Sequence, residues 1–308
     1  MKIPYLKNIK KFKPSVVAIG VFDGAHKGHL EILNQTKKIA AVHNLKSSVL
    51  TFYPHPLSVL KPALAPVLIT DLEERLHILK KTGIKQTAVV KFDKKFAQKK
   101  AEEFVKNILL KKLNAKWVVV GSDYRFGRET HGDKKILSDL GEKLNFKVTF
   151  VEPLKFKGHK ISSSLIRQLI AQDKLEDSAK CLGRYYSVKG KVVKGRGRGK
   201  ALGFPTANLD IPRDFLIKGG VYVGQVIIAK NQKLPAMIDV GMKPTFKGKT
   251  RLIEVNILDF SGKLYGKNIE VFFIKKLREE KKFKTPAHLI TQIQKDREKT
   301  LRVLEKVA

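Results

Sequence analysis

The sequence predicts an α/β Rossmann-like domain with a parallel sheet, followed by a small antiparallel β-barrel and a C-terminal helix. Apolar strand-like runs alternate with helical patterns over residues 16–151. Short strands separated by turn residues then follow one another over residues 185–277, and a long amphipathic segment closes the chain. The change of pattern divides the chain into domains 1–183 and 184–308.

Five apolar runs in the first domain are strand candidates, and helical patterns separate them. The runs are VVAIGVF, SSVLTFY, TAVVKF, WVVVGSDY and KVTFVEP. Between them, HLEILNQTKKIAAVH and DLEERLHILKKTG repeat apolar residues with the period of a helix. Strands that alternate with helices form parallel sheets, because each helix carries the chain back across the sheet.

The second domain consists mainly of alternating strands. Its runs YSVKGKVVKG, GVYVGQVIIA, LPAMIDVG, RLIEVNILDF and NIEVFFIKKL are separated by Gly, Asn and Ser turns, as in a small antiparallel barrel. In the last segment Thr285 is a candidate N-cap and Pro286 stands at the first helical position. One face of this helix carries Leu289, Ile293, Leu301 and Leu304.

Composition narrows the class of protein. The chain of 308 residues is 43% hydrophobic, enough for two domains that each bury a core, and no apolar stretch is long enough to span a bilayer. Its one cysteine, Cys181, cannot form an internal disulfide, which favours a reducing compartment, and we expect the protein to be cytoplasmic. We expect no membrane association.

The formal net charge of +35 suggests a nucleic-acid binder, but its distribution argues against one. Residues 1–183 hold 35 basic and 17 acidic side chains, and residues 184–308 hold 28 and 11. No basic arm stands out. We therefore expect no specific nucleic-acid partner and interpret the charge as a lysine-rich surface that attracts polyanions such as ATP.

The motif GVFDGAHKGH, residues 20–29, follows a predicted strand and leads into a helix that we expect to start near His29. Its glycines allow a tight turn, and the helix start offers free amide groups to an anion. His26 and His29 can both stabilise phosphate charge, although unrelated histidines or a metal site fit the same spacing. The candidate ATP- or phosphate-binding residues of this turn are Gly20, Phe22, Asp23, Gly24 and Gly28.

Three further segments of the first domain carry candidate ligand contacts. ISSSLIR offers Ser163, Ser164 and Arg167 to phosphates at the start of a helix expected from about residue 165. His55 in TFYPHP and Asp123 in GSDYRFG follow strands, where open α/β sheets bind ligands, and are candidates for substrate contact. A helix N-cap with a surface arginine is the alternative for ISSSLIR. A structural turn explains His55 and Asp123 nearly as well.

The second domain opens with GRGRGKALGFPTAN, in which Gly195, Gly199 and Gly203 recur every four residues before a Pro-Thr-Ala-Asn turn. A glycine-rich loop can wrap phosphates with backbone amides, although a mobile basic loop fits the same spacing. Thr206 and Asn208 supply neutral oxygen ligands suited to Mg²⁺, which accompanies nucleotide phosphates. No GK[ST] closes the loop, so it is not a Walker loop.

Glu254 in RLIEVNILDF is a candidate general base. Ile253, Val255 and Ile257 alternate with it, so its carboxylate shares the polar face of the strand with Asn256. Most such glutamates face solvent. A carboxylate in this setting can also accept a proton from an alcohol that attacks ATP.

These motifs, in this order, resemble the bacterial bifunctional riboflavin kinase/FMN adenylyltransferase (FAD synthetase) family over nearly the whole chain. The resemblance includes TFYPHP, GSDYRFG, LGRYY, GFPTANL, GVYVG, KPTF, ILDF, LYGK and LREEKKF. It implies an HxGH-type nucleotidyltransferase domain, a riboflavin-kinase barrel, and riboflavin, FMN and ATP as substrates. The residues implied for adenylyl transfer are His26, His29, Ser163, Ser164 and Arg167.

For the kinase the resemblance implies that Thr206 and Asn208 bind Mg-ATP and that Glu254 is the base. Four positions depart from the family pattern. Ser164 replaces the usual threonine, and Leu165 occupies an often basic position. Asp239 stands where asparagine is usual, and Asn256 where histidine is common.

Three rival interpretations remain open. Another HxGH nucleotidyltransferase explains only the first half of the chain. A nucleic-acid binder explains the charge but predicts clustered basic and aromatic residues. A single-activity relative with one decayed site is the nearest competitor. Oligomeric state, rates and transfer of FMN between the sites do not follow from the sequence.

Overall fold

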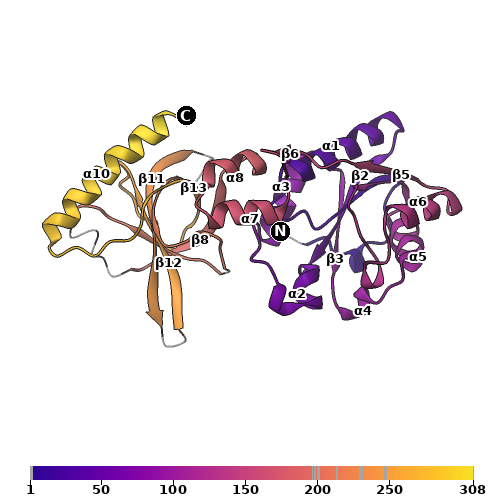
Figure 1. Cartoon of the computed structure of the whole chain (residues 1–308), viewed down its shortest axis with the longest axis horizontal. Coiled ribbons are helices and arrows are strands. Elements are labelled where there is room, and N and C mark those ends of the chain that lie inside the picture. Colours follow the sequence, from indigo (N-terminus) through magenta and orange to yellow (C-terminus); the bar gives the residue numbers. More distant parts are fainter. Residues whose placement is uncertain are drawn as a thin grey trace. The chain divides into compact units, whose positions relative to one another are not determined.

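The computed structural model describes residues 3–195, 197, 199, 202–212, 214–228, 232–245 and 248–307. Contacts divide the chain into two compact units, Met1–Ser163 and Ser164–Ala308, and each is described by itself. Figure 1 shows a sheet flanked by helices in the first and a barrel beside a long helix in the second. The boundary between residues 183 and 184 stays a prediction, because the contacts divide the chain by a different criterion.

The first unit contains a parallel five-stranded sheet in the order β3-β2-β1-β4-β5 (Figure 1). The strands are β1 (Ser15–Ile19), β2 (Lys46–Tyr53), β3 (Gln86–Lys91), β4 (Ala115–Gly121) and β5 (Lys147–Val151). Each corresponds to one predicted apolar run. The central strand β1 is buried along its whole length, because helices cover both of its faces. The predicted parallel α/β fold is confirmed.

Helices pack on the two faces of this sheet through alternate residues of β1. Ala18 packs with Leu33 and Leu76 on one face, and Val17 packs with Leu109 and Leu137 on the other. The helices are α1 (Lys27–Val42), α2 (Pro56–Leu60), α3 (Leu72–Lys81), α4 (Lys94–Ala97), α5 (Ala101–Phe104) and α6 (Lys134–Lys143). Shorter elements are η1 (Leu6–Asn8), η2 (Pro62–Leu64), the π-helical η3 (Val105–Lys112), η4 (Arg128–Thr130) and the hairpin β6 (Lys155–Phe156) and β7 (His159–Lys160).

Two helices begin earlier than the sequence suggests. Helix α1 begins at Lys27, because the His26 ring caps it and accepts a hydrogen bond from the His29 backbone. Helix α7 (Ser163–Ala171) begins at Ser163 and not near residue 165. Histidine and a run of serines are weak sequence signals for a helix start, which explains why each helix begins two residues before the approximate position expected.

The second unit is a closed antiparallel barrel with the strand order β10-β11-β12-β9-β8-β13, closed by the pairing of β13 with β10. Its strands are β8 (Tyr186–Val193), β9 (Ala207–Asp210), β10 (Gly220–Ile227), β11 (Lys233–Thr245), β12 (Gly248–Ile257) and β13 (Asn268–Arg278). The predicted barrel is confirmed. Strand β9 was expected to be part of a turn; instead its short Ala207–Asp210 segment bridges β12 and β8.

Helix α10 (Pro286–Glu305) packs on the barrel and begins as predicted, with Thr285 accepting a hydrogen bond from the backbone N–H of His288. Its buried face contains a charge as well as Leu304. Asp296 is buried and pairs with Arg278 of β13 at 2.8 Å. Since a buried carboxylate is costly without a partner, Arg278 fixes the position of this helix along the strand.

Helix α7 and helix α8 (Leu175–Leu182) belong to the compact unit of the barrel. Between them, Asp173 accepts a hydrogen bond from the buried Tyr222 hydroxyl at 3.1 Å and pairs with Lys276 at 2.9 Å. Helix α8 also buries Leu175 and Leu182. These contacts tie residues 164–183 to β10 and β13.

We expect a fragment of residues 164–308 to melt at a temperature about 5 °C or more above that of residues 184–308. The shorter fragment loses Asp173 and the apolar side chains of α8, each worth about 1 kcal/mol or more. Thermal unfolding followed by circular dichroism measures the difference. Equal melting temperatures would show that these helices contribute nothing to the stability of the barrel.

Candidate active sites

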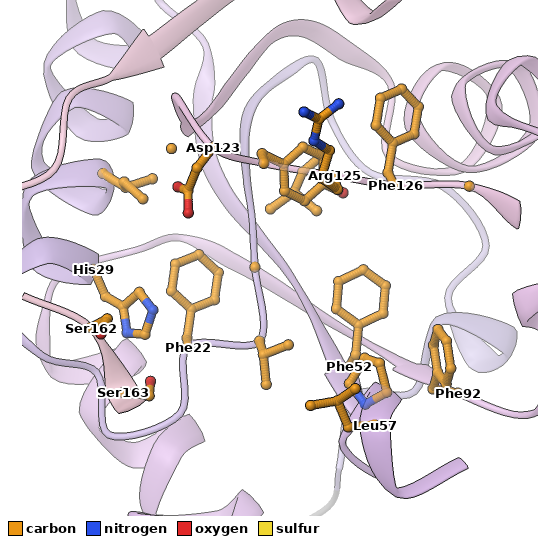
Figure 2. A pocket seen from close by; sticks show the side chains of 18 of the residues that line it. Phe22, His29, Phe52, Leu57, Phe92, Asp123, Arg125, Phe126, Ser162 and Ser163 are labelled. Carbon is orange, nitrogen blue, oxygen red and sulfur yellow. The ribbon is translucent and has the colours of Figure 1, made fainter. Parts of the chain in front are cut away.

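A cavity of about 930 Å³ opens in the first unit at the carboxyl ends of the parallel strands. One end, which we call the histidine end, is lined by His26, His29, Ser162 and Ser163. The other, the aromatic end, is lined by Phe52, Phe92, Phe96, Phe104 and Phe126. Figure 2 shows His29 and the two serines on one side of the cavity and Phe52, Phe92 and Phe126 on the other.

The turn that follows β1 forms the floor of the histidine end, and Asp23 fixes its shape. The Asp23 carboxylate is buried and accepts hydrogen bonds from the backbone N–H of Ile69 at 3.1 Å and of Thr70 at 3.0 Å. Gly24 has φ +79°, a conformation that favours glycine. Asp23 therefore acts on the turn, and its carboxylate is directed toward residues 69–70.

The two histidines stack on each other at the start of α1, with ring centroids 3.6 Å apart. The Nδ1 atom of His26 accepts from the His29 backbone N–H at 3.3 Å, so in the neutral ring Nε2 carries the proton and can donate. A Cβ atom at Gly28 would lie 3.2 Å from the His26 ring, so glycine makes room for the stack. The edge of the Phe22 ring supports His29.

His29 is held neutral at physiological pH. Burial lowers its pKa well below the usual 6.5, and the nearby charges of His26, Arg75 and Lys160 lower the pKa further. Its Nδ1 atom is buried and has no hydrogen-bond partner within the described part of the chain. A neutral ring can still donate one hydrogen bond to a phosphate oxygen.

The structure brings the two predicted phosphate motifs of the first domain together. The Ser163 hydroxyl donates to the backbone carbonyl of Asp23 at 2.9 Å, a contact that spans 140 positions of the sequence. Ser164 is exposed and Arg167 is half-buried on α7, and both cluster with the second unit. Their approach to the cavity stays a prediction.

The remaining two candidates of this domain differ in their surroundings. Asp123 lines the cavity beside the histidine end (Figure 2) and forms an ion pair with Lys160. His55 caps α2, its Nδ1 accepting from the Leu57 backbone at 3.2 Å. The cavity wall there consists of Pro56 and Leu57.

Sequence reasoning missed Lys160 and the aromatic end of the cavity. Lys160 directly precedes the serine motif, a position that could have indicated a further cation near phosphates. Phe52 and Phe92 lie at or just beyond the ends of β2 and β3, and Phe126 lies in the segment that follows β4. Aromatic residues at successive strand ends are the signal that could have identified this apolar end.

In the barrel, adjacent strands place the predicted kinase residues in one row. Asn208 of β9 is the register partner of Glu254 of β12, and Glu254 in turn is the partner of Asp239 of β11. The Thr206 hydroxyl donates to the Glu254 carboxylate at 3.2 Å. Asn256 donates to the carbonyl of Pro205 at 2.8 Å, which holds the segment before β9 against β12.

The glycine-rich segment before β9 packs closely against Asn208 and against the backbone that leads into β9. A Cβ atom on Gly195 would overlap the Asn208 side chain, and one on Gly199 would lie 2.4 Å from the carbonyl oxygen of Phe204. Gly203 has φ +84°, which favours glycine. Residues 196, 198, 200 and 201 of this segment lie outside the described residues.

Asp239, one of the departures from the family pattern, carries an unusual ionisation. Partial withdrawal from solvent raises its pKa, and repulsion from Glu280 and Glu254 adds to the effect, giving a pKa of about 6. The side chain as a whole stays exposed to water, which screens its interactions with the neighbouring charges. When ionised, Asp239 adds a second carboxylate charge to the row that contains Glu254.

We expect Asp239→Asn to raise the melting temperature at pH 7.5 more than at pH 4.5. The folded pKa of Asp239 lies above the unfolded value of about 3.9, so the parent loses stability as pH rises through that interval and regains none above pH 6. Asparagine does not titrate and escapes this loss. Thermal unfolding of both proteins at the two pH values measures it, and an equal gain at both would contradict the raised pKa.

Comparisons with known proteins match the two halves of the chain to two enzyme families. The profile of the family described as FAD synthetase matches residues 8–165, and that described as riboflavin kinase matches residues 182–304. A bifunctional riboflavin kinase/FMN adenylyltransferase of Buchnera aphidicola is 36% identical and covers 94% of this chain and 95% of its own. The protein of that name from Listeria monocytogenes is 38% identical, with coverages of 92% and 91%.

A solved structure covers the whole fold. It is named as a macrolide-efflux protein from Streptococcus pneumoniae, is 35% identical, and covers 97% of this chain and 98% of its own with a TM-score of 0.87. That name describes the other protein. Among the described residues, we find no helix with the length and apolar character needed to cross a bilayer.

Both halves of the chain thus match the two enzymes of one bifunctional family, and relatives with both activities align over more than nine-tenths of its length. The order of the motifs agrees with the order of the two folds. The chain belongs to the bifunctional riboflavin kinase/FMN adenylyltransferase family, which converts riboflavin to FMN and FMN to FAD with ATP as the second substrate.

Proposed function

We propose that the cavity of the first unit is the site of adenylyl transfer, with phosphates at the histidine end and the flavin ring at the aromatic end. The observation that carries this proposal is the hydrogen bond from Ser163 to the carbonyl of Asp23. It joins the serine motif to the glycine turn at the polar end of a cavity whose other end is aromatic. A flat conjugated ring packs well against such side chains.

Adenylyl transfer to FMN needs little acid–base chemistry, because the attacking phosphate of FMN is already an anion at neutral pH. The enzyme has to align it with the α-phosphate of ATP and stabilise the charge that passes to pyrophosphate. His29 donates from a neutral ring, His26 can donate from Nε2, and the free amides at the start of α1 add positive potential. Ser164 and Arg167 complete the site on the strength of the family resemblance.

The remaining residues of the turn shape this site. Gly20, Gly24 and Gly28 let the backbone and the His26 ring approach closely, and Phe22 and Asp23 hold the turn from below. Asp123 stands beside the histidine end, and its ion pair with Lys160 holds the positive charge of that lysine in the cavity wall. His55 acts through the cap of α2, which orients Pro56 and Leu57 in the wall.

For the kinase we propose that Glu254 removes the proton from the riboflavin hydroxyl that attacks the γ-phosphate of ATP. The hydrogen bond from Thr206 and the register pairing with Asn208 place this carboxylate beside the nucleotide motif. Gly195, Gly199 and Gly203 allow the preceding segment to follow the phosphates with its backbone amides.

The same residues fit Mg²⁺. Thr206, Asn208 and Glu254 each offer a side-chain oxygen, and oxygen is the ligand atom that this hard cation prefers. Thr206 and Asn208 would hold it together with ATP. When bound, the ion spreads the negative charge of the transferring phosphates, while Glu254 handles the proton.

One incubation tests both assignments. The purified protein is given riboflavin, ATP and Mg²⁺, and the flavins are separated by chromatography over time. We expect FMN to appear before FAD, and FAD alone to form when FMN is supplied. Omitting Mg²⁺ with excess chelator should stop FMN formation. A protein that makes FMN but never FAD, with FMN and ATP in excess, would contradict the assignment of the cavity.

The family activity also supports our proposal of a cytoplasmic location, since the single cysteine suits a reducing compartment where ATP is abundant. Fractionation of cells with an antibody against the chain tests the location.

A further inference from the structure

Arg75 of α3 is the largest fully buried side chain of the protein's described part, although sequence reasoning gave it no role. Its exposed fraction is 0%. Arginine is almost never fully buried unless its charge is paired and its N–H groups are bonded. Here Nε and Nη2 are buried without a hydrogen-bond acceptor among the described residues. Burial of a charged group with two unbonded nitrogen atoms is energetically unfavourable, so the position of Arg75 needs an explanation.

The guanidinium group lies under the carboxyl ends of two strands. Its Nη1 atom donates to the carbonyl of Val21 at 2.9 Å and to that of Phe52 at 3.2 Å. Val21 follows β1 in the glycine turn, and Phe52 lies at the end of β2. Both residues line the cavity. One side chain therefore joins the floor of the histidine end to the wall of the aromatic end.

The charge of Arg75 also reaches the phosphate-binding turn. Asp23 and Asp71 are its nearby anions, and Asp23 is the residue that fixes the turn. Burial lowers the pKa of Arg75 from its usual value, but a guanidinium stays protonated at neutral pH. On the other side, this charge is one of those that lower the pKa of His29. The neutral His29 ring thus stands above a permanent positive charge.

We propose that Arg75 is a positioning residue for adenylyl transfer: from beneath the cavity it fixes the ends of β1 and β2 and supplies lasting positive charge to the phosphate-binding turn. This inference rests on the proposed role of the histidine end. It gives the site a cation that does not depend on pH, whereas burial keeps His29 above it neutral. A neutral side chain could donate to the same two carbonyls, but without the positive charge the pKa of His29 would rise.

The experiment uses the full chain and compares Arg75→Gln with the parent in three readouts. The first is kcat and KM for ATP in FAD formation from FMN; the second is riboflavin phosphorylation, which reports on the other unit. The third is the titration of His29 followed by ¹H–¹⁵N NMR of the imidazoles. We expect kcat for adenylylation to fall at least about tenfold, more than KM rises. Phosphorylation should stay within about twofold.

The His29 titration separates a charge effect from a purely structural one. Removing a nearby positive charge raises the pKa of a histidine, so His29 in Arg75→Gln should titrate at higher pH than in the parent. Arg75→Lys keeps the charge, so His29 should titrate as in the parent and adenylylation should recover in part. If Arg75→Gln fails to fold, Arg75→Lys alone decides: a raised His29 pKa in the folded lysine variant would overturn the proposal.

Failure of this inference can be told from failure of the site assignment. A folded Arg75→Gln protein with parental kcat and parental His29 titration would overturn the role of Arg75. If His29→Ala also retained full adenylylation, the histidine end itself would be misassigned. If His29→Ala were inactive while Arg75→Gln stayed active, the site would stand and only the positioning role would fall.

Discussion

Replacing His29 with alanine is expected to lower FAD formation from FMN by about 10²-fold or more, the scale on which one donor to a developing phosphate charge contributes. The neutral ring lies at the start of α1, stacked on His26 and edge-on to Phe22, so alanine removes the donor and the support of its partner. Riboflavin phosphorylation should stay within about twofold of the parent, because the barrel forms a separate unit. Chromatographic rates for each step, measured with FMN or riboflavin supplied, test both expectations.

His43 provides the matched control, since it stands at the other end of the same helix and packs against Trp117, away from the cavity. His43→Ala should leave FAD formation near the parental rate. Equal loss of both activities in a folded His29→Ala protein, or equal effects of the two histidine variants, would contradict the assigned site.

Replacing Glu254 with glutamine is expected to lower the turnover of riboflavin phosphorylation by about 10²-fold or more, the usual scale of a general base. Glutamine keeps the size of the side chain and can still accept from Thr206, but it cannot take a proton. Binding of ATP and riboflavin should change far less than turnover. Steady-state kinetics and isothermal titration with each substrate separate the two effects.

Two companion variants make this result specific. Glu270→Gln changes a glutamate of β13 that accepts from Ser187, outside the row of Asn208, Glu254 and Asp239, and should stay active. Asp239→Asn removes the other carboxylate of that row. If Glu254→Gln phosphorylates riboflavin at nearly the parental rate while Asp239→Asn does not, the base has been assigned to the wrong carboxylate.

Much of the fold could be predicted because its signals are local. Apolar runs of five to eight residues alternating with helical patterns specify a parallel sheet whatever the details of packing. Thr285 before Pro286 identified the start of α10, because a cap and a fixed φ angle act within one turn. By contrast, β9 has only four residues, too few for alternation to distinguish it from a turn.

The site could be predicted only in part, because its geometry depends on contacts distant in sequence. Alternation along β12 correctly placed Glu254 on the polar face, but only strand register shows that Asn208 and Asp239 flank it. Arg75 lies in a helix whose pattern gives no reason to bury a charge at that position. Its partners are the carbonyls of Val21 and Phe52, and backbone atoms leave no trace in a sequence.

The row formed by Asn208, Glu254 and Asp239 across β9, β12 and β11 also limits how the family's chains can change in length. Side chains alternate between the faces of a strand, so one inserted or deleted residue in β12 would turn Glu254 into the packed interior and bring Ile253 or Val255 to the row. Closure of the barrel leaves no free edge at which a shifted strand could pair again. Insertions and deletions among relatives should therefore accumulate in the connections between strands and be absent from β9, β11 and β12.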